Sequence, residues 1–262
     1  MKALSQEEIE QICGLYKEHG SVRAVIKRMP VSNGSAHKYL TLKHLIRKQN
    51  IVRELKTHDE RLIGVYVGLW MGDGTQYKDG HSYTIKICTN SDDVNLNKFV
   101  KDLIILVFNK NTSLFKERHR KSAYIKFSSR FIFEFIHDYV VYDEKKKTYT
   151  VGLRKRANAY PKEFREGCLL GLALSDGYLK NNFVFTVSSA RLARNMYDLL
   201  AGFRYNPCSS LDRREKYHNN IMYSIKLTKP DSMALNVFLD KVIRSLGYTY
   251  SFKELKYGPG EI

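Results

Sequence analysis

The chain has 262 residues, and 43% of them are apolar, which is enough for a globular core and argues against disorder. Lys and Arg number 44 against 27 Asp and Glu, so the formal net charge is +17 and a polyanionic partner, nucleic acid first, is favoured. The four cysteines have neither zinc-ligand nor redox-pair spacing, and the apolar runs are too short to span a bilayer. With no apolar signal segment at the start, we expect a cytoplasmic protein of prokaryotic type without a membrane partner.

Residues 5–50 have the pattern of three short helices separated by Gly and Pro turns. Ser5 and Glu8 fit a capping box, and Gly20 ends the first helix. The third helix, beginning at Ser32 or Ser35, is rich in Lys, Arg and His. Residues 1–56 are therefore predicted to form a module like a helix-turn-helix. Its charges fit DNA binding, but they equally fit a small helical cap with a solvated surface, and the sequence leaves both open.

An internal repeat occupies the rest of the chain. Residues 62–74 read LIGVYVGLWMGDG, and residues 165–177 read REGCLLGLALSDG, so that two glycines and an Asp-Gly pair recur 103 positions later. Each copy is followed by the same series of segments: a β-rich stretch, a helical stretch, two more strand-like stretches and a further helix. The sequence therefore predicts an α+β fold made of two pseudo-symmetric αββαββα halves with antiparallel sheets, at residues 57–160 and 161–262.

Small residues four positions apart form one stripe along each repeated helix. The stripes consist of Gly64, Gly68 and Gly72 in the first copy and Gly167, Gly171 and Ser175 in the second. A glycine inside a helix costs about 1 kcal/mol relative to alanine, so three of them indicate close backbone approach. We therefore expect the two helices to pack together as the interface between the halves.

Each stripe ends in an aspartate, Asp73 or Asp176, at the end of the helix where the dipole is already negative. If the helices pack side by side, the two carboxylates and the terminal carbonyls meet in one negative pocket. Such oxygen ligands suit Mg²⁺, and paired carboxylates holding divalent ions are a known arrangement for phosphodiester hydrolysis.

The strand-like stretches alternate apolar and polar residues, so each half is predicted to have one sheet face under helices and one polar, basic face. Lys86, Lys126 and Lys226 lie on the polar faces. A twisted antiparallel face of this kind can sit in the major groove of duplex DNA, where base edges are distinguishable.

A charged run, Glu144 with Lys145–Lys147, precedes the end of the first half. It is predicted to be a solvated turn. Trp70, on the first repeated helix, is predicted to lie in the core.

The repeated segments resemble the LAGLIDADG motif of homing endonucleases: residues 66–74 read YVGLWMGDG and residues 169–177 read LLGLALSDG. The resemblance covers about residues 60–257 and implies the monomeric subclass with two motifs. It implies that the motif helices form the interface and that two saddle-shaped sheets grip a long, asymmetric duplex target. It also implies hydrolysis of both strands across the minor groove with short 3′ overhangs, using Mg²⁺ or, as a substitute, Mn²⁺. An intron-encoded enzyme is the expectation.

Carried over residue by residue, the resemblance makes Asp73 and Asp176 the catalytic, metal-binding acids and the carbonyls of Gly72 and Ser175 supporting ligands. It places Thr89 and Ser188 where polar residues organise the attacking water. The family often has Gln followed by Lys there, but this chain continues with Asn90 and Ser189, so we assign the basic catalytic role to the repeated Arg154 and Lys253. The residues expected to bind DNA are Lys86, Thr89, Asn90, Lys116, Arg118, Arg120, Lys126, Thr186, Ser188, Arg213, Arg214 and Lys226.

Other functions on the same scaffold remain open from the sequence. An RNA maturase that binds intron RNA, or a DNA-binding regulator, would share the fold without cleaving DNA. The loss of a motif acid would favour these alternatives, and both acids are present. An unrelated basic protein with a coincidental repeat is a further alternative.

Overall fold

The computed structural model describes residues 4–43, 45, 52–117, 121–214 and 220–258, without the side chains of 212–214 and 220. The chain divides into two compact units, Met1–Ile51 and Val52–Ile262. The first boundary falls slightly before the predicted one at residue 56. The reason is that Val52 packs in the core of the second unit and the Lys56 N–H donates to the Val107 carbonyl at 2.8 Å.

Three helices form the first unit: α1 (Gln6–His19), α2 (Val22–Arg28) and α3 (Asn33–Leu42). The predicted capping box of Ser5 and Glu8 is present, and Gly20 ends α1 in the left-handed region at φ 64°. Ser32, rather than Ser35, caps α3. The unit has its own core, made of Ile12, Val25, Met29, Val31, Ala36 and Leu40. The continuation of the third predicted helix, at 46–50, lies outside the described residues.

The first half of the second unit follows the predicted order. It comprises α4 (Glu60–Asp73), β1 (Gly74–Asp79), β2 (Ser82–Asn90), α5 (Val94–Phe108), β3 (Ser113–Lys116), β4 (Ser122–Ser128) and α6 (Arg130–Tyr139). The strands form one antiparallel sheet in the order β1-β2-β4-β3. A connection of β5 (Val140–Val141), α7 (Lys147–Thr150), β6 (Gly152–Leu153) and a 3₁₀ turn (Ala157–Ala159) leads into the second half.

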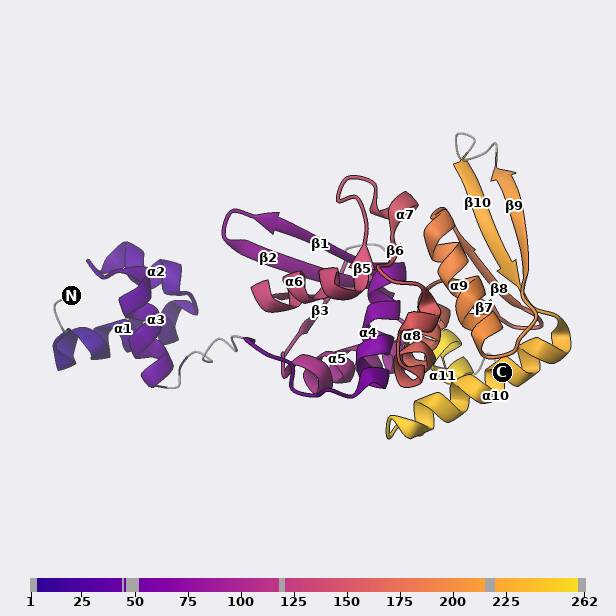
Figure 1. The fold of residues 1–262 in the computed structure, drawn as a ribbon. Coiled ribbons are helices and arrows are strands. Elements are labelled where there is room, and N and C mark those ends of the chain that lie inside the picture. The colour runs from indigo at the N-terminus through magenta and orange to yellow at the C-terminus, as the bar shows by residue number, and fades with distance from the viewer. Residues whose placement is uncertain (1–3, 44, 46–51, 118–120, 215–219, 259–262) are drawn as a thin grey trace. The chain divides into compact units, whose positions relative to one another are not determined.

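The second half repeats this arrangement. It comprises α8 (Lys162–Asp176), β7 (Gly177–Leu179), β8 (Phe183–Val187), α9 (Ala190–Gly202), β9 (Cys208–Arg214), β10 (Asn220–Lys226), α10 (Lys229–Ser245) and α11 (Phe252–Tyr257). Its sheet has the equivalent order β7-β8-β10-β9. The α+β fold with two pseudo-symmetric αββαββα halves is confirmed. Within this unit, the two sheets lie on either side of the central helices α4 and α8 (Figure 1).

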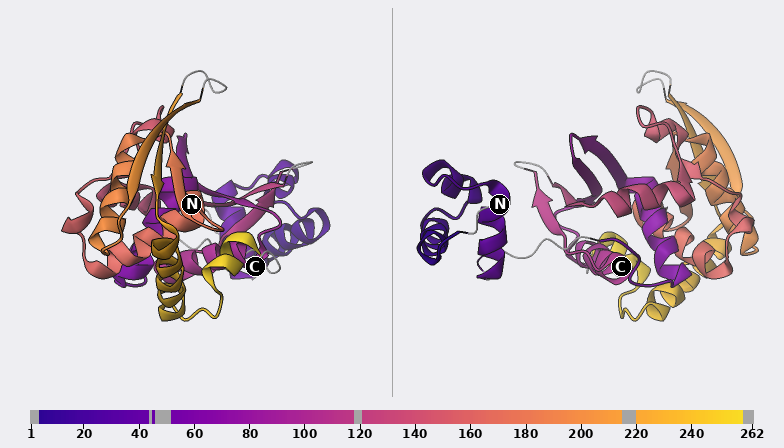
Figure 2. Two further views of the ribbon diagram at one scale, coloured as in Figure 1. Left: turned by 90° about the vertical axis from the view of Figure 1, so that its right-hand side faces the viewer. Right: turned by 60° about the vertical axis from the view of Figure 1, so that its left-hand side comes forward.

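The alternation predicted for the strands matches their burial. Ile85, Ile125 and Ile225 are at most 2% exposed beneath the helices, and Trp70 is fully buried. The polar faces have two exceptions, because Thr84 and Ser224 are also buried. Two further views show the helices gathered on one side of each sheet (Figure 2). In the described part of the chain, no helix combines the length and apolar character needed to cross a membrane.

Candidate active site

Helices α4 and α8 approach each other closely enough for backbone contact. A methyl group on Gly68 would lie 2.9 Å from the Leu172 nitrogen, and one on Gly171 would lie 2.7 Å from the Leu69 nitrogen. Both would also lie 3.0 Å from the α-carbon of the opposite glycine. These contacts exchange under the 103-residue offset, so the interface has the pseudo-twofold symmetry expected from the glycine stripes.

An ion pair crosses this interface outside the symmetry. Arg61 on α4 donates from both Nε and Nη2 to one carboxylate oxygen of Glu166 on α8, at 3.0 and 2.6 Å. Glu166 is 9% exposed, so the pair is largely removed from water. It lies near the start of both helices, at the opposite end from the two motif aspartates.

Asp73 and Asp176 are the last residues of α4 and α8. A methyl group on Gly72 would lie 2.6 Å from Oδ2 of Asp176, so the second carboxylate packs against the end of the first helix. Burial raises the pKa of Asp73 to about 6, and the Asp176 charge adds to that effect. Burial also raises the pKa of Asp176. The structure therefore brings together the two acids that the repeat predicts, in a setting that disfavours their negative charge.

Two lysines that the sequence did not predict to belong to the site bind the ends of the motif helices. Lys147 Nζ donates to the carbonyls of Trp70, Met71 and Gly74 at 3.1, 3.0 and 2.6 Å. It also lies 4.6 Å from the centre of the Trp70 ring. Lys147 belongs to the run predicted to be a solvated turn; Lys145 and Lys146 are exposed, but for Lys147 that prediction is wrong.

The equivalent group in the second half is Lys256 on α11. Its Nζ donates to the carbonyls of Leu174 and Ser175 at 2.6 and 2.5 Å. Each half thus places one ammonium group at the C-terminal end of its own motif helix, where the helix dipole is negative. The Ser175 carbonyl predicted as a metal ligand is among the groups bound in this way.

The electrostatics of the two lysines mirror those of the aspartates. Burial lowers the pKa of Lys147 to about 8, against the opposing charges of Asp176 and Asp73. Burial also lowers the pKa of Lys256, again opposed by both aspartates. The ends of the two motif helices therefore hold two carboxylates and two amines whose charged forms are disfavoured by burial and favoured by the opposite charges.

The donor set fits a divalent cation. Across the described residues, no cluster of three or more His, Cys, Asp or Glu side chains could hold a metal ion by itself. Mg²⁺, however, is commonly bound by one or two carboxylates together with waters and substrate phosphates. Asp73 and Asp176 supply such a pair, and a bound cation would offset the burial that raises both pKa values.

The polar face of the first sheet carries a row of residues across all four strands. Thr75, Lys86, Lys126 and Ser113 stand opposite one another in register. Lys86 Nζ lies 4.8 Å from the ring centre of Tyr124, so an aromatic side chain shares the face. Two lysines directly opposite each other repel, which favours an anionic ligand on this face.

On the second sheet, Thr186 and Ser224 stand opposite each other and their hydroxyl oxygens are 2.9 Å apart. Lys226 is exposed on the same strand face, and the Ser188 hydroxyl donates to Met222 Sδ at 3.1 Å. Six of the predicted DNA-binding positions therefore lie on the helix-free faces of the two sheets. They are Lys86, Asn90, Lys126, Thr186, Ser188 and Lys226.

Two predicted contact residues lie on the other side of the first sheet. Lys116 and Thr89 both stand opposite Ala123, on the face covered by helices. The Thr89 hydroxyl is buried without a hydrogen-bond partner in the described structure. Cys88, one residue earlier, lies on the open face, where Asp73 contributes to raising the pKa of its thiol after the larger effect of burial.

The predicted basic catalytic residues make contacts elsewhere. Arg154 Nε donates to the His137 carbonyl at 2.7 Å, and Lys253 lines a small cavity with Leu179 and Met233. Ser189 is buried and caps α9, donating to the Val151 carbonyl at 2.7 Å. Roles for Arg154 and Lys253 in catalysis stay predictions. Arg118 and Arg120 lie outside the described residues, as do the side chains of Arg213 and Arg214.

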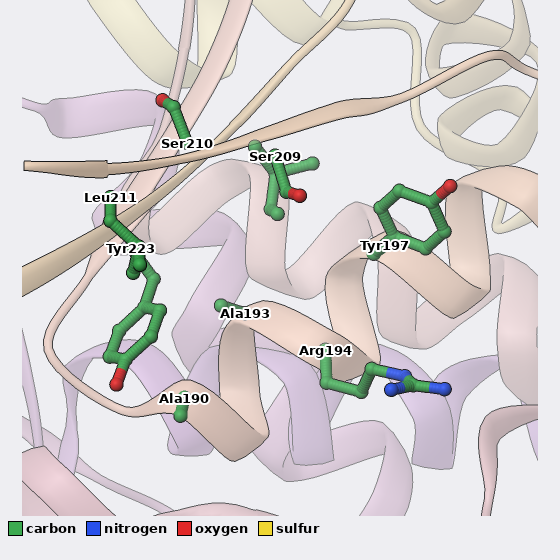
Figure 3. Close-up of a pocket in the computed structure, with 9 residues that line it drawn as sticks. Ala190, Ala193, Arg194, Tyr197, Ser209, Ser210, Leu211 and Tyr223 are labelled. Atoms are coloured by element: carbon green, nitrogen blue, oxygen red, sulfur yellow. The ribbon is translucent and has the colours of Figure 1, made fainter.

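A larger pocket of about 660 Å³ lies away from this set of residues. It is formed between helix α9 and strands β9 and β10, with Tyr197 and Arg194 on the helix side and Ser209, Leu211 and Tyr223 on the strand side (Figure 3). Neither aspartate and neither buried lysine lines it. None of the described residues that line it is acidic, so it is not the candidate active site.

Two α+β halves packed through glycine-lined helices, with an aspartate at the end of each, define the class of this protein. Solved structures with the same fold include those of the homing endonuclease I-DmoI. A set of mesophilic variants matches with a TM-score of 0.53 and 13% identity over 70% of this chain and 97% of that one. The complex with DNA and Mn matches with a TM-score of 0.50 and 12% identity, with the same coverage. The complex with DNA and Ca matches with a TM-score of 0.50 and 13% identity over 73% of this chain and 100% of that one.

At these identities the likeness shows the fold. The chain has the LAGLIDADG fold, with both motif copies in one polypeptide. No family model and no curated protein matches the sequence.

Proposed function

We propose that the chain is a site-specific endonuclease that hydrolyses one phosphodiester in each strand of a long, asymmetric duplex DNA site with a divalent metal. It acts as a monomer, leaves short 3′ overhangs and is intron-encoded. The proposal rests on one observation: Asp73 and Asp176 lie close together at the ends of two helices, α4 and α8, that are in backbone contact with each other. The shared fold of I-DmoI, solved with DNA and Mn or Ca, supports the substrate and the metal.

The two aspartates would hold Mg²⁺, for which Mn²⁺ would substitute, with the carbonyl of Gly72 as a further ligand. When bound, the metal polarises the phosphoryl oxygen, lowers the pKa of the attacking water and stabilises the leaving oxygen. The chain contributes position, because the helix contact holds the carboxylates on a rigid pair of elements rather than on loops.

Lys147 and Lys256 would neutralise phosphate charge as it develops. Each ammonium is held by carbonyls at the end of the motif helix in its own half, so one lysine is available for each strand of the duplex. Since burial lowers the pKa of Lys147 to about 8, this group can also exchange a proton near neutral pH.

The helix-free sheet faces would bind the duplex on both sides of the scissile phosphates. Lys86, Lys126 and Lys226 would supply salt-dependent affinity through phosphate contacts and polar contacts to base edges. The chain has 44 basic and 27 acidic residues, and this basic excess agrees with a polyanionic substrate.

The test works on a target of unknown sequence. Duplexes that bind in Ca²⁺ are selected from random and genomic pools, Mg²⁺ is then added, and the new ends are sequenced. The wild type should give discrete double-strand ends, and Asp73→Asn and Asp176→Asn should abolish them. Asp138→Asn, which changes an exposed aspartate on α6, is the matched control and should cleave normally.

Specific binding without new ends, the same in wild type and variants, would contradict the proposal. The motif helices would then have a purely structural role, and the protein would be a maturase or a DNA-binding regulator. Binding to intron RNA would distinguish the maturase from the regulator.

A further inference from the structure

The first unit of the chain has no part in the proposed cleavage, but its acidic and basic residues lie mostly on different helices. Helix α1 carries the acids, all of them exposed: Glu7, Glu8, Glu10 and Glu18. From Ser21 to Lys43 the sequence contains no Asp or Glu. The basic residues of this stretch, also exposed, are Arg23, Lys27, Arg28, Lys38 and Lys43. Helices α2 and α3 therefore present a cationic surface, with no carboxylate of their own to neutralise it.

The connection between α2 and α3 has the length typical of a helix-turn-helix. Four residues, 29–32, connect α2 to α3, and α1 packs with both through a common core. The three helices are drawn in indigo to violet in Figure 2. Ser32 fixes the start of α3, because its side chain accepts from the Ser35 N–H at 3.1 Å and its Oγ lies 2.9 Å from the Ser35 Oγ.

Helix α3 has one apolar and one polar face. Ala36 and Leu40 are fully buried in the core of the unit. On another face, Gly34, His37 and Lys38 are exposed at helical spacing. A methyl group on Gly34 would meet nothing nearer than the Ser32 hydroxyl at 4.0 Å, so the backbone there is open to close approach. Side chains with an imidazole and an ammonium group, beside a glycine, can donate to base edges without steric obstruction.

We propose that the first unit is a second module for reading duplex DNA, in which α3 enters the major groove. His37 and Lys38 contact base edges there, while basic residues of α2, including Arg28, contact phosphates. The occupant is duplex DNA rather than RNA, because an exposed helix enters the wide major groove of B-form DNA but not the deep, narrow one of A-form RNA. The full site would then have two parts, one for the cleavage unit and one for this module.

The experiment uses the full chain in Ca²⁺, which permits selection without relying on cleavage. Duplexes are selected with the wild type and mapped by hydroxyl-radical footprinting. Two separate protected blocks are expected. The double variant His37→Ala/Lys38→Ala should lose protection and sequence preference in one block only, and its affinity should fall roughly tenfold or more. Arg28→Ala should weaken binding on all sequences and reduce the salt slope by about one.

Lys17→Ala is the matched control, because Lys17 is an exposed lysine on α1, outside the cationic surface. It should leave both blocks and the affinity unchanged, and circular dichroism should show that all variants remain folded. A single protected block that the α3 variants do not alter would overturn the proposal. Variants that weaken only the binding of structured RNA would overturn it in favour of an RNA-binding module.

The readout is protection, not cleavage. Two protected blocks without Mg²⁺-dependent ends would contradict the endonuclease proposal and leave the DNA-reading module intact. Mg²⁺-dependent ends, together with one protected block that the α3 variants do not alter, would contradict the module and leave the endonuclease proposal intact.

Discussion

The contact between the motif helices predicts that a single methyl group at its centre is destabilising. In Gly68→Ala the new methyl would lie 2.9 Å from the Leu172 nitrogen and 3.0 Å from the Gly171 α-carbon. Ordinary van der Waals contact begins near 3.4 Å, and both neighbours are backbone atoms that cannot rotate away. The helices must therefore separate by about half an ångström or more.

Overpacking of this kind costs about 1–3 kcal/mol, against a gain of up to about 1 kcal/mol from the better helix propensity of alanine. We expect a net loss of roughly 1–2 kcal/mol. In Gly171→Ala the loss should be similar, because the contact is symmetric. The double variant should lose less than the sum, since the second methyl enters a gap that the first has opened.

Urea unfolding followed by fluorescence measures the effect, because Trp70 is the only tryptophan of the chain and is fully buried on α4. Gly202→Ala, on α9 of the same unit, is the control. There the methyl would meet only the end of the flexible Arg165 side chain at 3.3 Å, so stability should change little or rise. If Gly68→Ala were as stable as Gly202→Ala, the helices would not be in backbone contact and the reasoning would be refuted.

Three further outcomes follow from the same unit. Folding raises the pKa of Asp73 from 3.8 to about 6, so above pH 6 its ionised carboxylate opposes folding. Asp73→Asn should therefore stabilise the metal-free protein by roughly 2–3 kcal/mol at pH 7.5. The gain should disappear below pH 4 in thermal melts, and a gain independent of pH would contradict the assignment. Arg61→Ala should cost about 2–3 kcal/mol, because it leaves the buried Glu166 with only the longer ion pair to Lys162 at 3.9 Å. In urea unfolding, the double variant with Glu166→Leu should recover most of the loss; no recovery would mean that the ion pair is not the cause. Lys147→Met should slow cleavage of a selected duplex roughly 100-fold, while Lys145→Met, at an exposed neighbour, should not; equal rates would exclude the proposed role.

The helix interface and its acids could be predicted because their signals repeat. Glycines at intervals of four have no use on an isolated helix, and an Asp at a helix end is unfavourable, so two copies of both features point to a shared contact. The structure has this contact at Gly68 and Gly171, with the carboxylates at its end. Here the sequence carries both the geometry and its reason.

The two lysines could not be found in the same way. Lys147 and Lys256 lie 109 positions apart rather than 103, because the segments that follow the second strand pair differ in length between the halves. Lys147 also stands in a run of three lysines, and composition alone does not show which one turns inward. What decides it is the cluster of carbonyls at the end of α4, which comes next to Lys147 only when the chain has packed.

The position of Thr89 and Lys116 on the helix-covered face has a simpler cause. Side chains on a strand alternate between faces, so an alignment that is one residue out moves a residue to the opposite face. The resemblance places Thr89 near the scissile phosphate, but the face toward Asp73 belongs to Cys88. The resemblance identifies the strand, and only the pairing of β2 with β4 determines the face.

The most direct test of the central claim, that two halves share one metal-dependent site, is the Mg²⁺-started cleavage of a selected duplex with each aspartate changed separately. We predict that Asp73→Asn and Asp176→Asn each abolish double-strand cleavage in Mg²⁺ and in Mn²⁺ while retaining the binding measured in Ca²⁺. Normal double-strand cleavage by either variant would contradict the claim, because it would show that the paired carboxylates are not a common site.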